Sequence, residues 1–135
     1  MTRAYPILCG VTGALMILIG LGMFFAFLGS LAPGSVGIFP FPLGPQGYYF
    51  VAFTGSCLVA WGGCLIGAAR GQGARVIGTA TAVGLVLGAF YRMLVWFMGD
   101  FAWLGDLPRV EAAVLLLLAL AFVWLRPPAS AAEPL

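Results

Sequence analysis

The chain has 135 residues, of which 63% are hydrophobic and only 7% are charged. Soluble domains carry about 25% charged residues, so this composition excludes a soluble domain and predicts an integral membrane protein. The charged residues are six Arg and four acids, with no His or Lys, which disfavours nucleic-acid binding, metal sites built on His, and Ser-His or Cys-His catalysis.

Four apolar segments are long enough to cross a bilayer, because a hydrocarbon core of about 30 Å needs about 20 helical residues. They predict an all-α fold, a polytopic membrane protein whose four-helix transmembrane bundle forms a single domain over residues 1–135. The expected spans are residues 6–30, 48–69, 76–98 and 107–126.

The connection between the first two spans, residues 31–47, is apolar, uncharged and contains four prolines. We expect Pro40, Pro42 and Pro45 to exclude regular helix and to favour extended polyproline II geometry. The simplest interpretation is a connector at the membrane surface. The alternative is a surface that docks another membrane protein or gates a lipid site. The residues that would dock are Ile38, Phe39 and Phe41.

Small residues predict where helices pack closely, because van der Waals contact replaces the hydrophobic effect between helices in lipid. Stripes of small residues at four-residue spacing are the expected packing positions, and glycines seven apart form a second pattern. The stripes are Ala80, Gly84 and Gly88 in the third span, with Gly63 and Gly67 in the second. The heptad glycines are Gly13 and Gly20, and Gly55 and Gly62. The alternative use of a stripe is homodimerisation.

Other polar and sulfur-containing side chains within the spans are expected to be structural. The three cysteines, Cys9, Cys57 and Cys64, have no C-x-x-C spacing for metal or redox chemistry, so we expect them to be buried packing residues. The hydroxyls of Thr54, Ser56, Thr79 and Thr81 are expected to form hydrogen bonds between helices.

Arg92 is the most informative residue, because a charge inside a span is costly. It lies roughly 9 Å from the outer end of the third span, and Glu111 lies at a similar depth in the fourth. We expect these two to pair, with Tyr91 and Trp96 shielding the guanidinium, Trp96 by stacking. Together with Asp100 they form a predicted polar cluster. It is either the floor of an outward-facing pocket for a lipid-like or anionic ligand, or an ion pair that locks two helices together.

The arginines also predict the orientation. With four spans both termini share a side, and most arginines fall there, which the positive-inside rule assigns to the cytoplasm. These arginines are Arg3, Arg70, Arg75 and Arg126. Tyr5 and Trp124 are expected in the aromatic belt at that interface.

The layout resembles that of small uncharacterised bacterial four-helix integral membrane proteins. The shared features are Tyr91-Arg92 late in the third span, the Gly99-Asp100 turn after it, and Glu111 at the start of the fourth. The resemblance implies a bacterial cytoplasmic membrane and carries no activity.

Together these observations predict a non-enzymatic membrane protein that binds a lipid-like ligand, or serves as an accessory subunit, through the outer pocket and the loop 31–47. The expected partners are membrane lipids, another membrane protein or a second copy of the chain. We expect no nucleic acid, cofactor or metal. The alternative is a small homo-oligomeric channel or transporter. Glu111 lies near one end of its span, which disfavours proton coupling and leaves passive conduction open.

Overall fold

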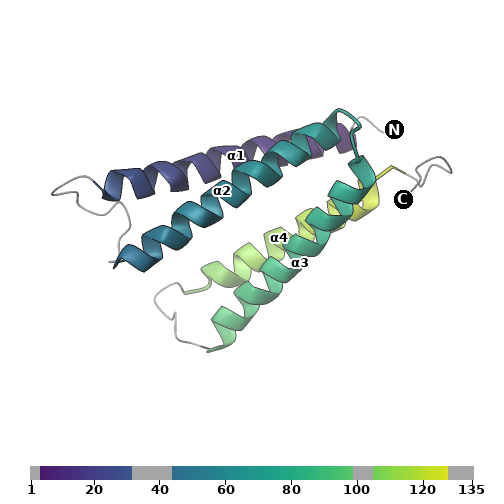
Figure 1. Ribbon diagram of the computed structural model, residues 1–135. Coiled ribbons are helices and arrows are strands. Elements are labelled where there is room, and N and C mark those ends of the chain that lie inside the picture. The colour runs from purple at the N-terminus through teal and green to yellow at the C-terminus, as the bar shows by residue number, and fades with distance from the viewer. Residues whose placement is uncertain (1–3, 32–43, 99–104, 128–135) are drawn as a thin grey trace. The chain divides into compact units, whose positions relative to one another are not determined.

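The structure, a computed structural model, describes residues 4–31, 44–98 and 105–127. Within them lie four α-helices, shown in chain order in Figure 1. They are α1 (Ala4–Ser30), α2 (Gly44–Ala69), α3 (Ala74–Met98) and α4 (Leu107–Leu125). All four are long and apolar enough to cross a membrane. Even the shortest, α4 with 19 residues, is about 28 Å long, which matches a hydrocarbon core of about 30 Å. The predicted all-α class with four spanning helices is confirmed.

The start of α2 corrects the expectation for the preceding loop. The helix begins at Gly44, whose φ is 62°, so Pro45 lies in its first turn instead of excluding helix. A proline is tolerated there because backbone N–H groups of the first turn have no partner within the helix. The three predicted docking residues, Ile38, Phe39 and Phe41, lie outside the residues that the structure describes.

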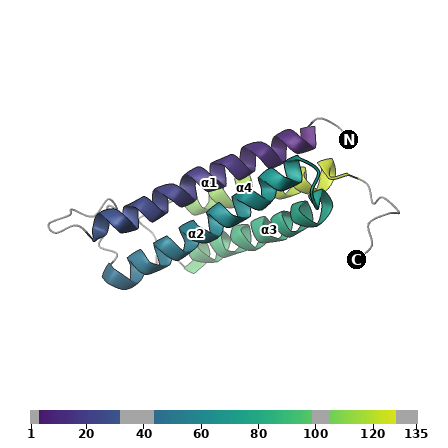
Figure 2. The same ribbon diagram turned by 45° about the horizontal axis from the view of Figure 1, so that its top comes forward.

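The chain divides into two compact units, and residues 9–67 form one of them from most of α1 together with α2. Figures 1 and 2 show these helices side by side. They approach at two pairs of buried glycines. A Cβ on Gly20 would lie 2.5 Å from the Gly55 carbonyl oxygen, and one on Gly13 would lie 2.8 Å from the Gly62 carbonyl oxygen. These distances are too short for any side chain, so the heptad glycines set the closest approach of the two helices.

Most residues of the predicted four-residue stripes lie outside the packing faces of these units; Gly88, where a Cβ would lie 3.5 Å from Leu115 Cδ1, is the exception. Ala80, Gly84 and Gly63 are exposed, whereas Gly88 and Gly67 are half-buried. A Cβ on Gly84 or Gly63 would meet nothing within 4 Å. The reason is geometrical: at 3.6 residues per turn a four-residue row drifts by about 40° per step, whereas a seven-residue row drifts by about 20°. Only the heptad row keeps facing one neighbour.

The other unit contains residues 1–8 and 68–135, that is, the first turn of α1 with α3 and α4. Figures 1 and 2 show α3 and α4 lying side by side and running antiparallel. Their buried positions include many small residues, which allows a close approach. These positions are Ala74, Gly78, Thr81, Ala82, Leu85, Ala89 and Val95 on α3, and Pro108, Ala112, Ala119 and Phe122 on α4.

Tyr5, which is expected in the aromatic belt, is buried within this unit. Its side chain is only 1% exposed. The hydroxyl donates a hydrogen bond to the Ala74 carbonyl oxygen, and the ring stands edge-on to Phe122, with centroids 6.3 Å apart. A Cβ on Gly78 would collide with the Tyr5 hydroxyl. Glycine at position 78 therefore leaves space for the Tyr5 side chain. No local sequence pattern predicts this contact between Gly78 and Tyr5.

Two expectations for small polar groups are corrected as well. Cys9 is buried, but Cys57 and Cys64 are exposed. A cysteine behaves as a small hydrophobic residue. Exposure of its side chain to lipid therefore costs no free energy. The Ser56 hydroxyl bonds the Ala52 carbonyl oxygen of its own helix at 3.0 Å, because the preceding turn supplies the nearest acceptor.

Candidate functional site

The predicted contact between Arg92 and Glu111 is present. The Arg92 Nε lies 3.0 Å from Glu111 Oε2, with 42% and 38% of the two side chains exposed. Arg92 follows the buried residues Thr81 and Leu85 by 11 and 7 positions, so its backbone lies on the buried face of α3. The long side chain carries the guanidinium from that face to α4 and towards the surface. The antiparallel register of α3 and α4 thus brings two opposite charges together. Either charge alone would cost more free energy within the membrane.

The aromatic neighbours are arranged differently from the prediction. The Tyr91 ring centroid lies 6.0 Å from the Arg92 guanidinium carbon. Trp96, expected to stack on Arg92, instead lies with its ring centroid 5.5 Å from the guanidinium carbon of Arg109. Because the Arg92 side chain extends to Glu111, the Trp96 indole contacts the Arg109 guanidinium of α4. Trp96 thus stacks on Arg109.

Arg109 and Asp106 also belong to this cluster, through their own ion pair and the contact of Arg109 with Trp96. Asp106 is the N-cap residue of α4, yet its side chain makes no capping hydrogen bond. Its Oδ1 lies 3.5 Å from Arg109 Nη2 instead. The spacing of three residues is a visible signal for such a pair. The Trp96–Arg109 contact has no such signal, since it depends on the register between two helices.

The two ends of the α3–α4 unit differ in charge. At the end of the α3–α4 connection, two arginines face two carboxylates in two ion pairs. The predicted cluster member Asp100 lies outside the described residues. At the opposite end lie Arg70, Arg75 and Arg126, and both carboxylates that the structure describes are at the other end. Counted over the described residues, one end therefore carries no net charge and the other is positive.

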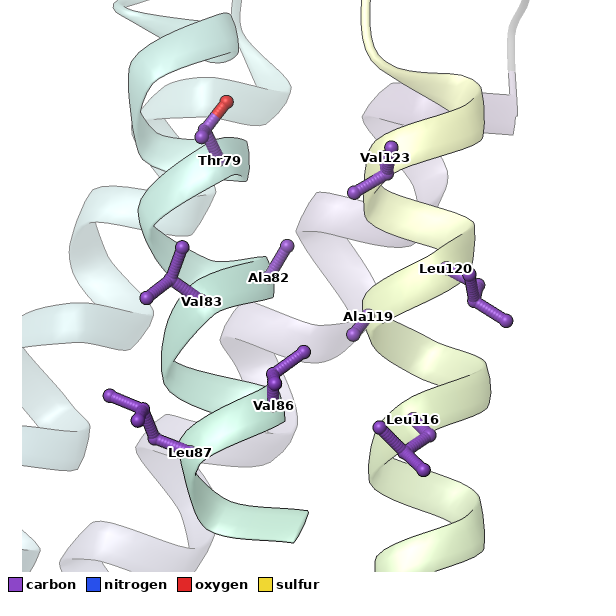
Figure 3. A pocket seen from close by; sticks show the side chains of 9 residues that line it. All are labelled: Thr79, Ala82, Val83, Val86, Leu87, Leu116, Ala119, Leu120 and Val123. Carbon is purple, nitrogen blue, oxygen red and sulfur yellow. The ribbon is translucent and has the colours of Figure 1, made fainter. Parts of the chain in front are cut away.

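An apolar groove runs between α3 and α4, with a volume of about 450 Å³. Figure 3 shows its lining side chains, of which only Thr79 carries a polar atom. The lining residues are Thr79, Ala82, Val83, Val86, Leu87, Leu116, Ala119, Leu120 and Val123. The Thr79 hydroxyl donates to the Arg75 carbonyl oxygen at 2.8 Å and accepts from Arg126 Nη1 at 3.2 Å. The expected hydrogen bond between helices is therefore present at Thr79, and it stands at the positive end.

A second cavity, of about 340 Å³, lies where α1 ends and α2 begins. It is lined by Phe27, Ser30, Leu31, Gly44 and Tyr48. Neither cavity is lined by Arg92 or Glu111. The ion pair between α3 and α4 is therefore not on the floor of either cavity. In the described segments no three side chains of His, Cys, Asp or Glu gather as a metal site would need.

Comparison with known proteins adds no further constraint. No family model matches this sequence, and neither a curated protein nor a solved structure matches it. The contacts and charges of the residues described above therefore carry the functional conclusion.

Proposed function

We propose that this chain is a non-enzymatic integral membrane protein that binds a lipid-like ligand through the polar cluster around Arg92 and Glu111. The observation that carries the proposal is their half-exposed ion pair, with the two charges 3.0 Å apart on helices long enough to span a membrane. A charge near a helix centre costs about 2.5–3.5 kcal/mol on insertion scales. Charges kept at membrane depth are thus a functional hypothesis by default.

The charge balance of the cluster indicates the kind of headgroup. Its described charges form two ion pairs, Arg92 with Glu111 and Asp106 with Arg109, which suits a polar headgroup without net charge. Arg92 uses Nε for Glu111, so its two Nη groups can donate to a phosphate or carbonyl oxygen. Glu111 can accept hydrogen bonds from an amine or a hydroxyl. A simple anion would meet the two carboxylates and gain less.

The location follows from the same charges. The positive-inside rule assigns the end with Arg70, Arg75 and Arg126 to the cytoplasm, and the polar cluster to the outer half. The resemblance to bacterial four-helix proteins supports a bacterial cytoplasmic membrane. In this proposal the loop residues Ile38, Phe39 and Phe41 dock a partner subunit.

The test uses a charge swap that keeps the ion pair and reverses its direction. Wild type and the double variant Arg92→Glu with Glu111→Arg are purified in mild detergent, and retained phosphatidylethanolamine is measured by native mass spectrometry. We expect the swapped protein to keep its thermal stability but to retain at least fivefold less of this zwitterionic lipid. Lipid binding depends on which charge contacts which part of the headgroup. Helix packing depends only on the attraction between the charges at positions 92 and 111.

Three outcomes contradict the proposal. Equal lipid retention in both proteins would leave the pair as a helix clamp only. Selective solute or ion flux through liposomes that contain the wild-type protein, lost in the swapped variant, would favour a homo-oligomeric channel. Retention of another membrane protein in place of lipid would assign the cluster to an accessory subunit.

A further inference from the structure

The groove between α3 and α4 combines an apolar channel with a cation fixed at one end. We propose that this groove holds an acyl chain of an anionic phospholipid, whose phosphate binds the Arg126 guanidinium. This inference goes beyond the proposed function, because it uses the opposite end of the α3–α4 unit and a different face of α3. Failure at one site leaves the other proposal standing.

The dimensions of the groove fit one leaflet. Its lining runs from Thr79 to Leu87 on α3, which is about 12 Å along the helix axis at 1.5 Å per residue. Half of a hydrocarbon core of about 30 Å is about 15 Å. Figure 3 shows Ala82 and Ala119 across the middle of the groove, where larger side chains would fill it. An acyl chain can thus lie along the groove with its headgroup at the Thr79 end.

The hydrogen bonds of Thr79 position the cation. The Thr79 hydroxyl donates its proton to the Arg75 carbonyl oxygen, so the hydroxyl oxygen accepts a hydrogen bond from Arg126 Nη1. This contact holds one side of the guanidinium against the groove. A guanidinium has five N–H donors, and those not used on Thr79 can form the paired hydrogen bonds that phosphates accept.

Charge complementarity then selects the headgroup. Among the described residues, each carboxylate already pairs with another arginine, Glu111 with Arg92 and Asp106 with Arg109. Arg126 is therefore a half-buried cation that donates a hydrogen bond to a neutral hydroxyl. An anionic lipid supplies a negative charge that no described carboxylate supplies to Arg126, and its chain covers the apolar lining that a free phosphate would leave empty.

The cation is tested with lipid mixtures. The full-length protein is incubated with equal amounts of phosphatidylglycerol and phosphatidylcholine in detergent, and bound lipids are counted by native mass spectrometry. We expect a preference for phosphatidylglycerol that Arg126→Gln reduces about fivefold, since one arginine near a membrane surface contributes roughly that factor. The matched control is Arg70→Gln, because Arg70 is an exposed arginine at the same end without a contact to the groove. It should change the preference less than twofold.

The groove is tested by filling it. The Val86 side chain points across towards α4 in Figure 3, so Val86→Phe should lower the number of bound phosphatidylglycerol molecules by one. Val114→Phe enlarges another exposed valine outside the lining and should leave that number unchanged. If Arg126→Gln and Arg70→Gln have equal effects, or if both phenylalanine variants do, the site is ordinary annular lipid and the inference is wrong. Displacement of the lipid by millimolar inorganic phosphate would assign Arg126 to a free anion.

Discussion

The Arg92–Glu111 ion pair shows how two spans can each carry a charge. Alone, each side chain would face the cost of placing a charge at membrane depth, whereas together they satisfy each other at 3.0 Å. Both remain partly exposed, so the pair is worth less than a fully buried one. Exposed pairs contribute about 0–1 kcal/mol, while breaking a buried pair costs about 3–5 kcal/mol.

The energetic role of this pair is measurable in a double-mutant cycle. We expect Arg92→Leu and Glu111→Leu each to lower stability more than the combined variant, with a coupling free energy of about 1 kcal/mol. Each single variant leaves an unpaired charge, and the combined variant leaves none. Unfolding in detergent micelles measures the four free energies. Strict additivity of the single effects would show that the two side chains do not interact in the membrane protein.

The contact of α1 with α2 depends on the absence of side chains. Gly20 and Gly55 lie close enough that a Cβ on either would fall within 2.6 Å of the carbonyl oxygen of the other. Two turns along, Gly13 and Gly62 repeat the arrangement. Such contacts bring the backbones together, which is how small residues hold helices in lipid.

One added methyl group tests this contact. We expect Gly20→Ala to destabilise residues 9–67 by about 1–3 kcal/mol, as overpacking does, measured by thermal unfolding in detergent. Gly22→Ala is the control two residues away, because a Cβ at Gly22 meets nothing within 4 Å. That variant should be neutral or more stable by up to about 1 kcal/mol, since alanine favours helix over glycine. Equal effects of the two variants would exclude a tight glycine contact.

Sequence reasoning predicted the elements better than it predicted their faces. Long uncharged runs require spanning helices because no other structure satisfies the backbone in lipid, so the four helices follow from composition. Which side of a helix meets its neighbour depends on register. Opposite charge and equal depth were enough to predict the Arg92–Glu111 contact. The Trp96–Arg109 and Arg126–Thr79 contacts need the helix register itself, which composition does not contain.

At the scale of the whole molecule, the arginines define two unlike ends of the α3–α4 unit. We expect the turn that contains Gln72 to face the cytoplasm and the start of α4 to face outward. In a cysteine-free background, Leu107→Cys should react with a membrane-impermeant maleimide on intact bacteria. Gln72→Cys should react only after permeabilisation. The reverse pattern would place both termini outside and would move the anionic lipid site to the outer leaflet.

Tyr5 gives the beginning of the chain a partner near its end. Ala74 follows it by 69 residues, so at about 5–20 residues per second the ribosome needs roughly 3–14 s to supply that acceptor. Phe122 comes later still. Until then the Tyr5 hydroxyl needs another hydrogen-bond partner. The membrane–water interface can supply one, because amphipathic aromatic rings are stable there. The first turn of α1 is thus synthesised well before the residues that complete its final environment.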